Sequence, residues 1–228
     1  MYNQKRTIMK KIYTLLIALV FVVTMASESK AQLTAGVDLY SSYVWRGTKF
    51  GGPCIQPSVK YTTEGLTAGI WGSYDVTGYK ETDPYISYSL PIGLSLGVTD
   101  YYYEGDLTDF SDTTGSHAFE VNLGYTLKGL TLSGNYILNQ AGGAGSMGGD
   151  LYFQATYAFK SFSAFVGAGN GWHTLNKDNG DDKFNICNIG IQASKTIEVT
   201  DKFSIPVTGQ IIVNPDNKKI YMVVGISL

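Results

Sequence analysis

Charged side chains are scarce in this chain, and basic residues do not outnumber acidic ones. Only 16% of the 228 residues are charged, and 17 Lys and Arg against 19 Asp and Glu give a net charge of -2. The first 31 residues contain five of the basic residues and one acidic residue, which leaves 12 basic and 18 acidic residues after them. A basic surface is the usual footprint of a nucleic-acid-binding protein. We therefore expect no nucleic-acid partner.

Long apolar runs are absent except for one near the start of the chain. Residues 12–26 are apolar, follow Lys10 and Lys11, and precede Ser29-Lys30-Ala31, which fits a small-x-small cleavage site. The run is shorter than the roughly 20 residues that a membrane-spanning helix needs. The pattern predicts a secretory signal peptide over residues 1–31 and one mature domain over 32–228. A retained membrane anchor is the alternative, and helical membrane topology is excluded.

Cysteine is also rare, with only Cys54 and Cys187. An exported chain meets an oxidising compartment, so a disulfide has to be considered. In the strand register below, the two residues lie on strands that are not neighbours and face opposite ways. We therefore expect free thiols, with a disulfide as the alternative, and a Cys54–Cys187 bridge would contradict this register.

What the chain has instead is an alternation of apolar and polar residues, which recurs about every 16 residues after Gln32 and is typical of strands. The clearest example is residues 119–128, and we expect the first strand at 33–46, strands of irregular pattern around Asp100 and over 184–197, and a last strand at 219–228. Aromatic residues lie near the ends of the apolar faces: Tyr43, Trp45, Tyr61, Tyr74, Tyr102, Tyr125, Tyr136 and Tyr157. Asp100 marks either the rim of the sheet or a bulge.

The connections between these strands alternate in length. Short turns are expected at 63–65, 91–93, 128–129 and 160–161, and longer polar loops at 47–54, 76–82, 104–116, 141–149, 175–182 and 214–218. Strands of 9 to 11 residues, an even strand number and this alternation are typical of outer-membrane barrels. Since an exposed apolar last strand would recruit other chains, we expect it to pair with the first. The sequence predicts an all-β, transmembrane, antiparallel up-and-down barrel of about 12 strands. A secreted soluble β-sandwich is the alternative.

Several short motifs resemble the TorF family of porin-like proteins. They are Tyr40-Ser41-Ser42-Tyr43-Val44-Trp45-Arg46-Gly47 with Pro57, Gly69-Ile70-Trp71, Glu81-Thr82-Asp83-Pro84-Tyr85, Gly97 with Tyr101-Tyr102-Tyr103-Glu104-Gly105, and Phe119-Glu120 with Gly124-Tyr125. The resemblance covers most of the mature chain. It implies a channel in the bacterial outer membrane. The chain departs from the pattern at Asp100 and at Leu228, where such barrels commonly end in Phe.

Charged residues on the polar parity are expected to face the lumen, and they are the candidate site residues: Asp38, Arg46, Lys60, Asp75, Glu120, Lys128 and Lys160. Arg46 and Lys60 have Glu120 and Asp75 as potential partners. One interpretation is a constriction that filters small hydrophilic solutes. The other is a set of ion pairs that only compensate charges inside the barrel. Lumen aromatics are expected at Tyr40, Trp71, Tyr101 and Tyr152.

Catalytic and cofactor motifs are missing. His117 and His173 have no Ser or Asp at a spacing that indicates a nucleophile and base, and the glycine-rich 141–146 lacks the Lys and helix of a phosphate loop. The acidic stretches with Asp106, Asp109 and Asp112 and at 178–182 are read as solvated loops, with a divalent cation as the alternative. We expect no enzyme activity, no cofactor and no metal.

The predicted function is a passive outer-membrane pore for small hydrophilic solutes, with outer-membrane lipids and those solutes as partners. The alternative is a plugged barrel with a structural or surface-interaction role and no transport. An eight-stranded barrel is filled by side chains and a sixteen-stranded one is open. About twelve strands therefore leaves both alternatives open, and the oligomeric state as well.

Overall fold

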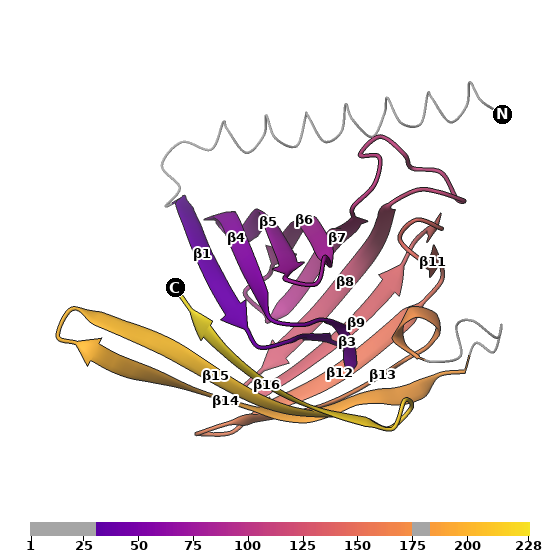
Figure 1. Cartoon of the computed structure of the whole chain (residues 1–228). Coiled ribbons are helices and arrows are strands. Elements are labelled where there is room, and N and C mark those ends of the chain that lie inside the picture. Colours follow the sequence, from indigo (N-terminus) through magenta and orange to yellow (C-terminus); the bar gives the residue numbers. More distant parts are fainter. Residues whose placement is uncertain (1–30, 175–182) are drawn as a thin grey trace.

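Twelve antiparallel strands form one closed barrel (Figure 1). The computed structural model describes residues 31–174 and 183–228. Neighbours around the ring follow the order β1-β16-β15-β14-β13-β12-β9-β8-β7-β6-β5-β4, and β4 pairs with β1. The predicted all-β barrel is confirmed. The strands are β1 (Gln32–Tyr40), β4 (Cys54–Thr63), β5 (Leu66–Asp75), β6 (Lys80–Ser89), β7 (Leu94–Tyr103), β8 (His117–Leu127), β9 (Leu130–Ile137), β12 (Leu151–Ala158), β13 (Ser163–Gly169), β14 (Asn185–Thr200), β15 (Phe203–Asn214) and β16 (Lys219–Ser227).

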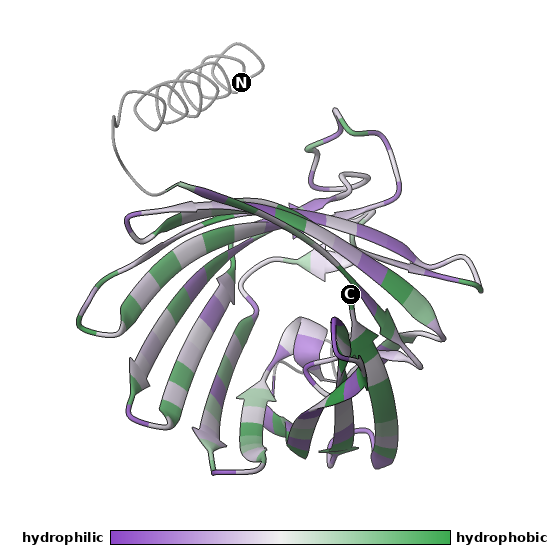
Figure 2. Cartoon of the chain, turned by 90° about the vertical axis from the view of Figure 1, so that its left-hand side faces the viewer, coloured by the Kyte–Doolittle hydropathy of each residue, from purple (hydrophilic) through white to green (hydrophobic). Residues whose placement is uncertain are grey.

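Apolar side chains cover the outside of the barrel because successive residues of a strand point to opposite faces. Figure 2 shows the resulting alternation of green and purple bands along the strands. Leu96, Leu123 and Phe153 lie on this outer face and are 56%, 49% and 50% exposed. The opposite parity carries Ser, Thr, Asn and Gly toward the lumen, as at Ser87, Gly97 and Asn122, which lie in register on β6, β7 and β8.

The last strand closes the ring against the first, as predicted. Asp38, Leu39 and Tyr40 of β1 pair with Ser227, Ile226 and Gly225 of β16. The backbone amides of Val37 and Leu228 donate to each other's carbonyl oxygens at 3.1 and 2.9 Å. The ring is therefore closed at its seam by a short ladder of three residue pairs.

Long and short connections lie at opposite ends of the barrel. The end with turns such as Glu64-Gly65 and Lys128-Gly129 is called the short-turn end here. The other end, called the long-loop end, carries residues 104–116, the small sheet of β10 (Gln140–Ala141) and β11 (Ser146–Met147), and the 3-10 helix η1 (Gly171–His173). Backbone hydrogen bonds from Gly142 to Asp112 and from Ala144 to Gly115 join two of these loops.

The first strand is shorter than predicted. It ends at Tyr40, and the chain then forms a separate hairpin of β2 (Tyr43–Trp45) and β3 (Thr48–Gly51). The predictions of a strand over 33–46 and of an outer loop over 47–54 were therefore wrong. Tyr43 and Trp45 were expected at the lipid interface, but Tyr43 is 8% exposed and both rings contact lumen aromatics. The reason is a bend at Ser41-Ser42, where the Ser41 hydroxyl accepts from the Val224 amide in place of a ladder partner.

Two irregular positions have simple explanations. The register of β14 against β13 shifts between Gly167 and Ala168, which leaves Cys187 as the extra residue of a bulge. Apolar parity therefore changes from Ile186 to Ile189, and the predicted opposite facing of the two cysteines is wrong: Cys54 and Cys187 are both buried, free thiols on separated strands. At Asp100 no register shift occurs; its carboxylate pairs with His117 at 2.8 Å near the long-loop end.

The predicted signal peptide, apart from Ala31, and the predicted loop at 175–182 lie outside the described residues. Within the residues that the structure does describe, no helix has the length and apolar character needed to cross a bilayer.

Candidate functional site: the barrel lumen

A hairpin occupies the lumen at the long-loop end. We call residues 43–51 the plug hairpin: they leave the wall after β1 and run toward the β12 side (Figure 1). At its base, Ser42 Oγ donates to the Gly51 carbonyl at 3.0 Å, and the Gly52 amide donates to Asp75 Oδ2 at 2.8 Å. Its two strands pair only with each other and form a sheet separate from the barrel.

The tip of the plug hairpin fits tightly against the wall formed by β14 and β15. Arg46 and Gly47 both have positive φ angles, 49° and 81°, as a two-residue hairpin turn requires. Asn214 on β15 donates from Nδ2 to the Gly47 carbonyl at 3.0 Å. A Cβ atom on residue 47 would lie 1.9 Å from the carbonyl oxygen of Cys187 on β14. Only glycine satisfies both the backbone angle and this approach.

The Arg46 side chain forms a two-pronged ion pair with Glu120 of β8. Its two terminal nitrogens donate to Oε1 at 2.6 Å and Oε2 at 2.8 Å, and the Glu120 side chain is fully buried. Oε2 also accepts from the Tyr101 hydroxyl at 2.9 Å and from Asn122 Nδ2 at 2.6 Å. The guanidinium lies over the Trp45 ring, 4.2 Å from its centre, and also over Tyr152. Both buried charges are thereby compensated, which such pairs require.

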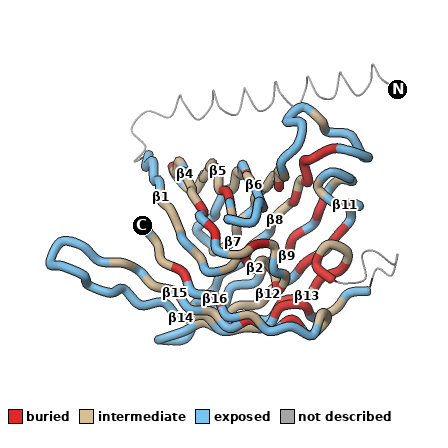
Figure 3. The backbone as a smooth tube through the Cα atoms, in the orientation of Figure 1, coloured by how far each residue is buried: buried red, intermediate tan, exposed pale blue. Residues whose placement is uncertain are grey.

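Aromatic rings fill the space around this ion pair. Trp45 meets Tyr101 and Trp172 edge to face, with ring centres 5.3 and 6.2 Å apart. On the other side of the hairpin, Tyr43 contacts Trp71, Phe50 and Tyr79. Ala118 and Ile137, both fully buried, join Tyr101 in a small apolar cluster. Figure 3 shows buried residues gathered toward the long-loop end.

His173 of η1 packs under the same guanidinium. It is 1% exposed, and its Nε2 lies 3.5 Å from an Arg46 nitrogen. Burial lowers the pKa of His173 well below its ordinary value, and the neighbouring Arg46 charge lowers it further. The imidazole is therefore neutral at pH 7 and can accept a hydrogen bond from Arg46.

Glu81 and Asp83 form a second acidic site that the sequence reasoning missed. They are 2% and 4% exposed, on the parity of β6 that faces the lumen, and Tyr79 donates its hydroxyl to Glu81 at 2.7 Å. In the part of the chain that the structure describes, no basic side chain forms an ion pair with either. The sequence does contain a signal for this site: in the alternation of β6, Glu81 and Asp83 share the face of Tyr85, which points into the lumen.

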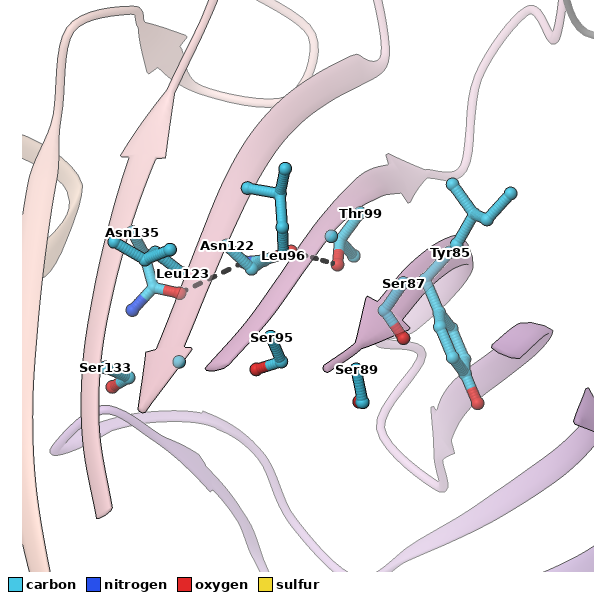
Figure 4. Close-up of a pocket in the computed structure, with 13 residues that line it drawn as sticks. Tyr85, Ser87, Ser89, Ser95, Leu96, Thr99, Asn122, Leu123, Ser133 and Asn135 are labelled. Atoms are coloured by element: carbon cyan, nitrogen blue, oxygen red, sulfur yellow. Dashed lines mark hydrogen bonds between the residues drawn. The ribbon is translucent and has the colours of Figure 1, made fainter. Parts of the chain in front are cut away.

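Toward the short-turn end the lumen opens into a polar pocket of about 340 Å³, which we call the vestibule (Figure 4). It is bounded by β6, β7, β8 and β9, and Ser95 points into it while the neighbouring Leu96 points the opposite way. The residues that line it are uncharged. Three are apolar, Ile86, Leu96 and Leu123, and the polar ones are Tyr85, Ser87, Ser89, Ser95, Thr99, Asn122, Ser133 and Asn135. A chain of hydrogen bonds joins Thr99, Asn122 and Asn135 at 2.9 and 3.0 Å.

The seven charged residues predicted to face the lumen do not form one cluster. Arg46 and Glu120 meet, whereas Asp38 on β1 and Lys60 on β4 lie on the lumen wall away from them. Asp75 accepts hydrogen bonds from Gly52, Thr77 and Tyr79 and so organises a loop and the base of the plug hairpin. Lys160, like Lys128, lies in an exposed turn at the short-turn end.

The acidic loop at 104–116 is organised by its own hydrogen bonds. Thr108 donates to Asp106 from its amide and hydroxyl, and Ser111 and Thr114 donate to Asp109. These bonds hold the pKa of both carboxyls below the ordinary value. Over residues 31–174 and 183–228, no three His, Cys, Asp or Glu side chains gather as metal ligands.

Comparisons with known proteins give distant structural similarities. An engineered triple mutant of the porin from Rhodopseudomonas blastica is 13% identical, with 87% of this chain and 73% of that chain covered and a TM-score of 0.42. OccK8 (OprE) of Pseudomonas aeruginosa is 14% identical, with 86% and 66% covered and a TM-score of 0.39. Both similarities are too low to carry an inference about function. No curated protein sequence matches the chain significantly. A family profile matches residues 24–208, and the chain belongs to that family, described as "Bacterial protein of unknown function (Gcw_chp)".

Proposed function

We propose that this chain is an outer-membrane pore for the passive passage of small hydrophilic solutes, gated by the plug hairpin. The observation that carries the proposal is the closed barrel with an apolar outside and a polar inside. Apolar side chains such as Ile191, Ile211 and Met222 are 47%, 41% and 76% exposed on its outer face. In water this surface would promote aggregation, whereas in lipid it is the stable arrangement for a barrel without free edges. The TorF resemblance agrees with this role and stays a prediction.

In this proposal the short-turn end faces the periplasm and the long-loop end faces the outside, as in bacterial outer-membrane barrels. The vestibule then opens to the periplasm, and the plug hairpin closes the outer half. Solutes pass when the hairpin moves. The barrel ladder does not have to break for this, because β2 and β3 pair only with each other. The role is passive and involves no catalytic step.

Conductance tests the proposal. The folded protein, identified by heat-modifiable gel migration, is inserted into planar bilayers, and uptake of small sugars and amino acids is followed by liposome swelling. We expect discrete current steps and uptake that falls with solute size. Arg46→Ala should raise the open fraction and change ion selectivity, because it removes the cation at the tip of the plug hairpin. A folded preparation with neither current nor uptake contradicts the proposal.

A permanently closed barrel with a surface role is the second candidate. It is favoured by the buried Arg46–Glu120 pair and by the hydrogen-bonded loops above it. The native Cys187 thiol separates the two candidates, because it is fully buried beside Gly47. In a Cys54→Ser background, a water-soluble maleimide should label Cys187 of a gated pore within the time of solute uptake. A permanently closed barrel stays unlabelled until it is denatured.

A further inference from the structure

The vestibule has the chemistry of a binding site for a neutral, ring-shaped, hydroxyl-rich solute. Its volume of about 340 Å³ falls in the range of roughly 300–1,000 Å³ usual for ligand pockets. None of the side chains that line it carries a charge near neutral pH. A charged ligand would lose its hydration there without gaining an opposite charge. A purely apolar ligand would leave hydroxyl and amide groups unpaired.

Tyr85 supplies a flat apolar surface in this polar pocket. A Cβ atom on Gly69 of β5 would lie 2.7 Å from both Cζ and the hydroxyl of Tyr85, so the ring crosses the backbone of its neighbour strand. One face of the ring therefore rests on the wall, and the side chain as a whole stays partly exposed. Phe165 of β13 lies over Gly190 in the same way. It is elsewhere around the barrel, with β12, β9, β8 and β7 between its strand and β6.

Fixed amides and free hydroxyls lie to one side of the Tyr85 platform, on β6, β7, β8 and β9 (Figure 4). Asn122 donates from Nδ2 to both Glu120 and Asn135 and accepts from Thr99, which fixes its orientation. By contrast, the hydroxyls of Ser87, Ser89, Ser95 and Ser133 have no hydrogen-bond partner within the described ranges. In Figure 4, Ser87, Ser89 and Tyr85 point to the same side of β6. These hydroxyls are available to a solute without the loss of a protein hydrogen bond.

We propose that the vestibule binds a neutral sugar of one or two rings, stacked on Tyr85 and hydrogen-bonded by the serine hydroxyls and fixed amides around it. This assignment rests on the proposed function, because it names the class of solute that the pore passes. Aromatic rings offer stacking area and the polar groups around them fix orientation, which together select a cyclic polyol over other neutral solutes.

Maltose is the probe, glucose is a smaller neutral comparator, and sodium glutamate and lysine hydrochloride are charged comparators closer in size to glucose than to maltose. Binding to the detergent-folded protein is measured by calorimetry, and block of the current is measured in planar bilayers. We expect saturable binding of maltose, at least tenfold weaker binding in Tyr85→Ala, and near wild-type binding in Tyr85→Phe, which keeps the ring. Tyr157→Ala is the matched control, because Tyr157 is an aromatic residue on the outer face with 50% exposure.

The outcomes separate the two proposals. Current without maltose binding, or with tighter binding of glutamate or lysine, overturns the sugar site and leaves the pore intact. Maltose binding without current or uptake overturns the proposed pore function and leaves the proposed sugar site standing. Equal maltose affinity in wild type and Tyr85→Ala, with both proteins folded by heat-modifiable migration, overturns the assignment of Tyr85.

Discussion

The two halves of the lumen differ in packing even where one strand lines both. On β8, Glu120 at the long-loop end is completely buried, whereas Thr126 on the same face near the short-turn end is exposed. On β6, Glu81 is buried and Ser89 is exposed. The strands are equally regular in both halves, so strand geometry is not the cause. The difference arises from the plug hairpin, which adds large side chains to one half only.

This contrast shows how a twelve-stranded barrel can be both closed and open. The long-loop half behaves like a protein core, in which buried charges need partners and small changes in volume are costly. In the short-turn half the side chains that face the lumen are partly or fully exposed, as they are on a protein surface. If this is correct, substitutions in the two halves should have very different costs, and the following experiments test that difference.

The largest effect is expected from Glu120→Ala. It leaves the Arg46 guanidinium buried without an opposite charge, and breaking a buried pair costs about 3–5 kcal/mol. That cost falls on the closed position of the plug hairpin, so maleimide labelling of Cys187 in the Cys54→Ser background should accelerate more than about a hundredfold. Lys80→Ala is the control, because it breaks an ion pair with Glu104 in which both side chains are at least half exposed. Equal rates in the two variants would contradict a closing role for the Arg46–Glu120 pair.

A matched pair of enlargements compares the two halves directly. Ala118→Leu inserts volume beside Tyr101 and Ile137, where no space is left, and overpacking typically costs about 1–3 kcal/mol. Ser133→Leu inserts a similar volume into the vestibule and should change the free energy of unfolding by less than about 0.5 kcal/mol. Urea unfolding of both variants in the same detergent measures the difference. Equal costs would mean that the short-turn half is packed as well.

An effect smaller than that of Glu120→Ala is expected from Gly47→Ala, which tests the fit of the hairpin tip. The new methyl group meets the Cys187 carbonyl oxygen, and the backbone at φ 81° is unfavourable for alanine, so we expect a cost of about 1–3 kcal/mol in plug closure. Gly78→Ala provides the control: its φ is 108°, but no atom lies within 4 Å of the added methyl group. Cys187 labelling should therefore accelerate in Gly47→Ala alone. Similar acceleration in both would indicate backbone strain without contact.

The sequence predicted the wall of the barrel because its signal is local. A strand that faces lipid on one side and polar groups on the other must alternate, so Phe119, Val121 and Leu123 reveal their side without any knowledge of their neighbours. Even the irregular stretch at 184–197 contained real information, because the bulge at Cys187 is what changed its parity. Closure of the ring followed from the apolar last strand.

The plug hairpin was missed because its partners are distant in sequence. Tyr43 and Trp45 continue the alternation of β1, so their pattern fits an outer face. Contacts with residues far away in sequence, such as Glu120 with Arg46 and Asn214 with Gly47, hold the segment inside. The sequence offered Glu120 and Asp75 as potential partners of Arg46. The alternation along a strand shows which face of the barrel a residue is on, but it does not show how far along the barrel axis the residue lies. For the same reason the sequence did not separate Asp75 and Lys160 from the buried pair.

The smallest effect is expected from pH and concerns His173. Because its pKa in the closed state is well below the ordinary value of about 6.5, closure requires the neutral imidazole. The closed state therefore keeps its full stability above about pH 6.5 and loses it as the pH falls below that value, by up to about 1.4 kcal/mol at one pH unit below. Cys187 labelling at pH 5.5, normalised to the denatured protein at the same pH, should be up to about tenfold faster than at pH 7.5. His173→Gln keeps a polar, uncharged side chain and should remove this dependence, since the variant has no imidazole to protonate beside Arg46. If Cys187 labelling in His173→Gln depends on pH as it does in the wild type, the acid response comes from another group in the long-loop half.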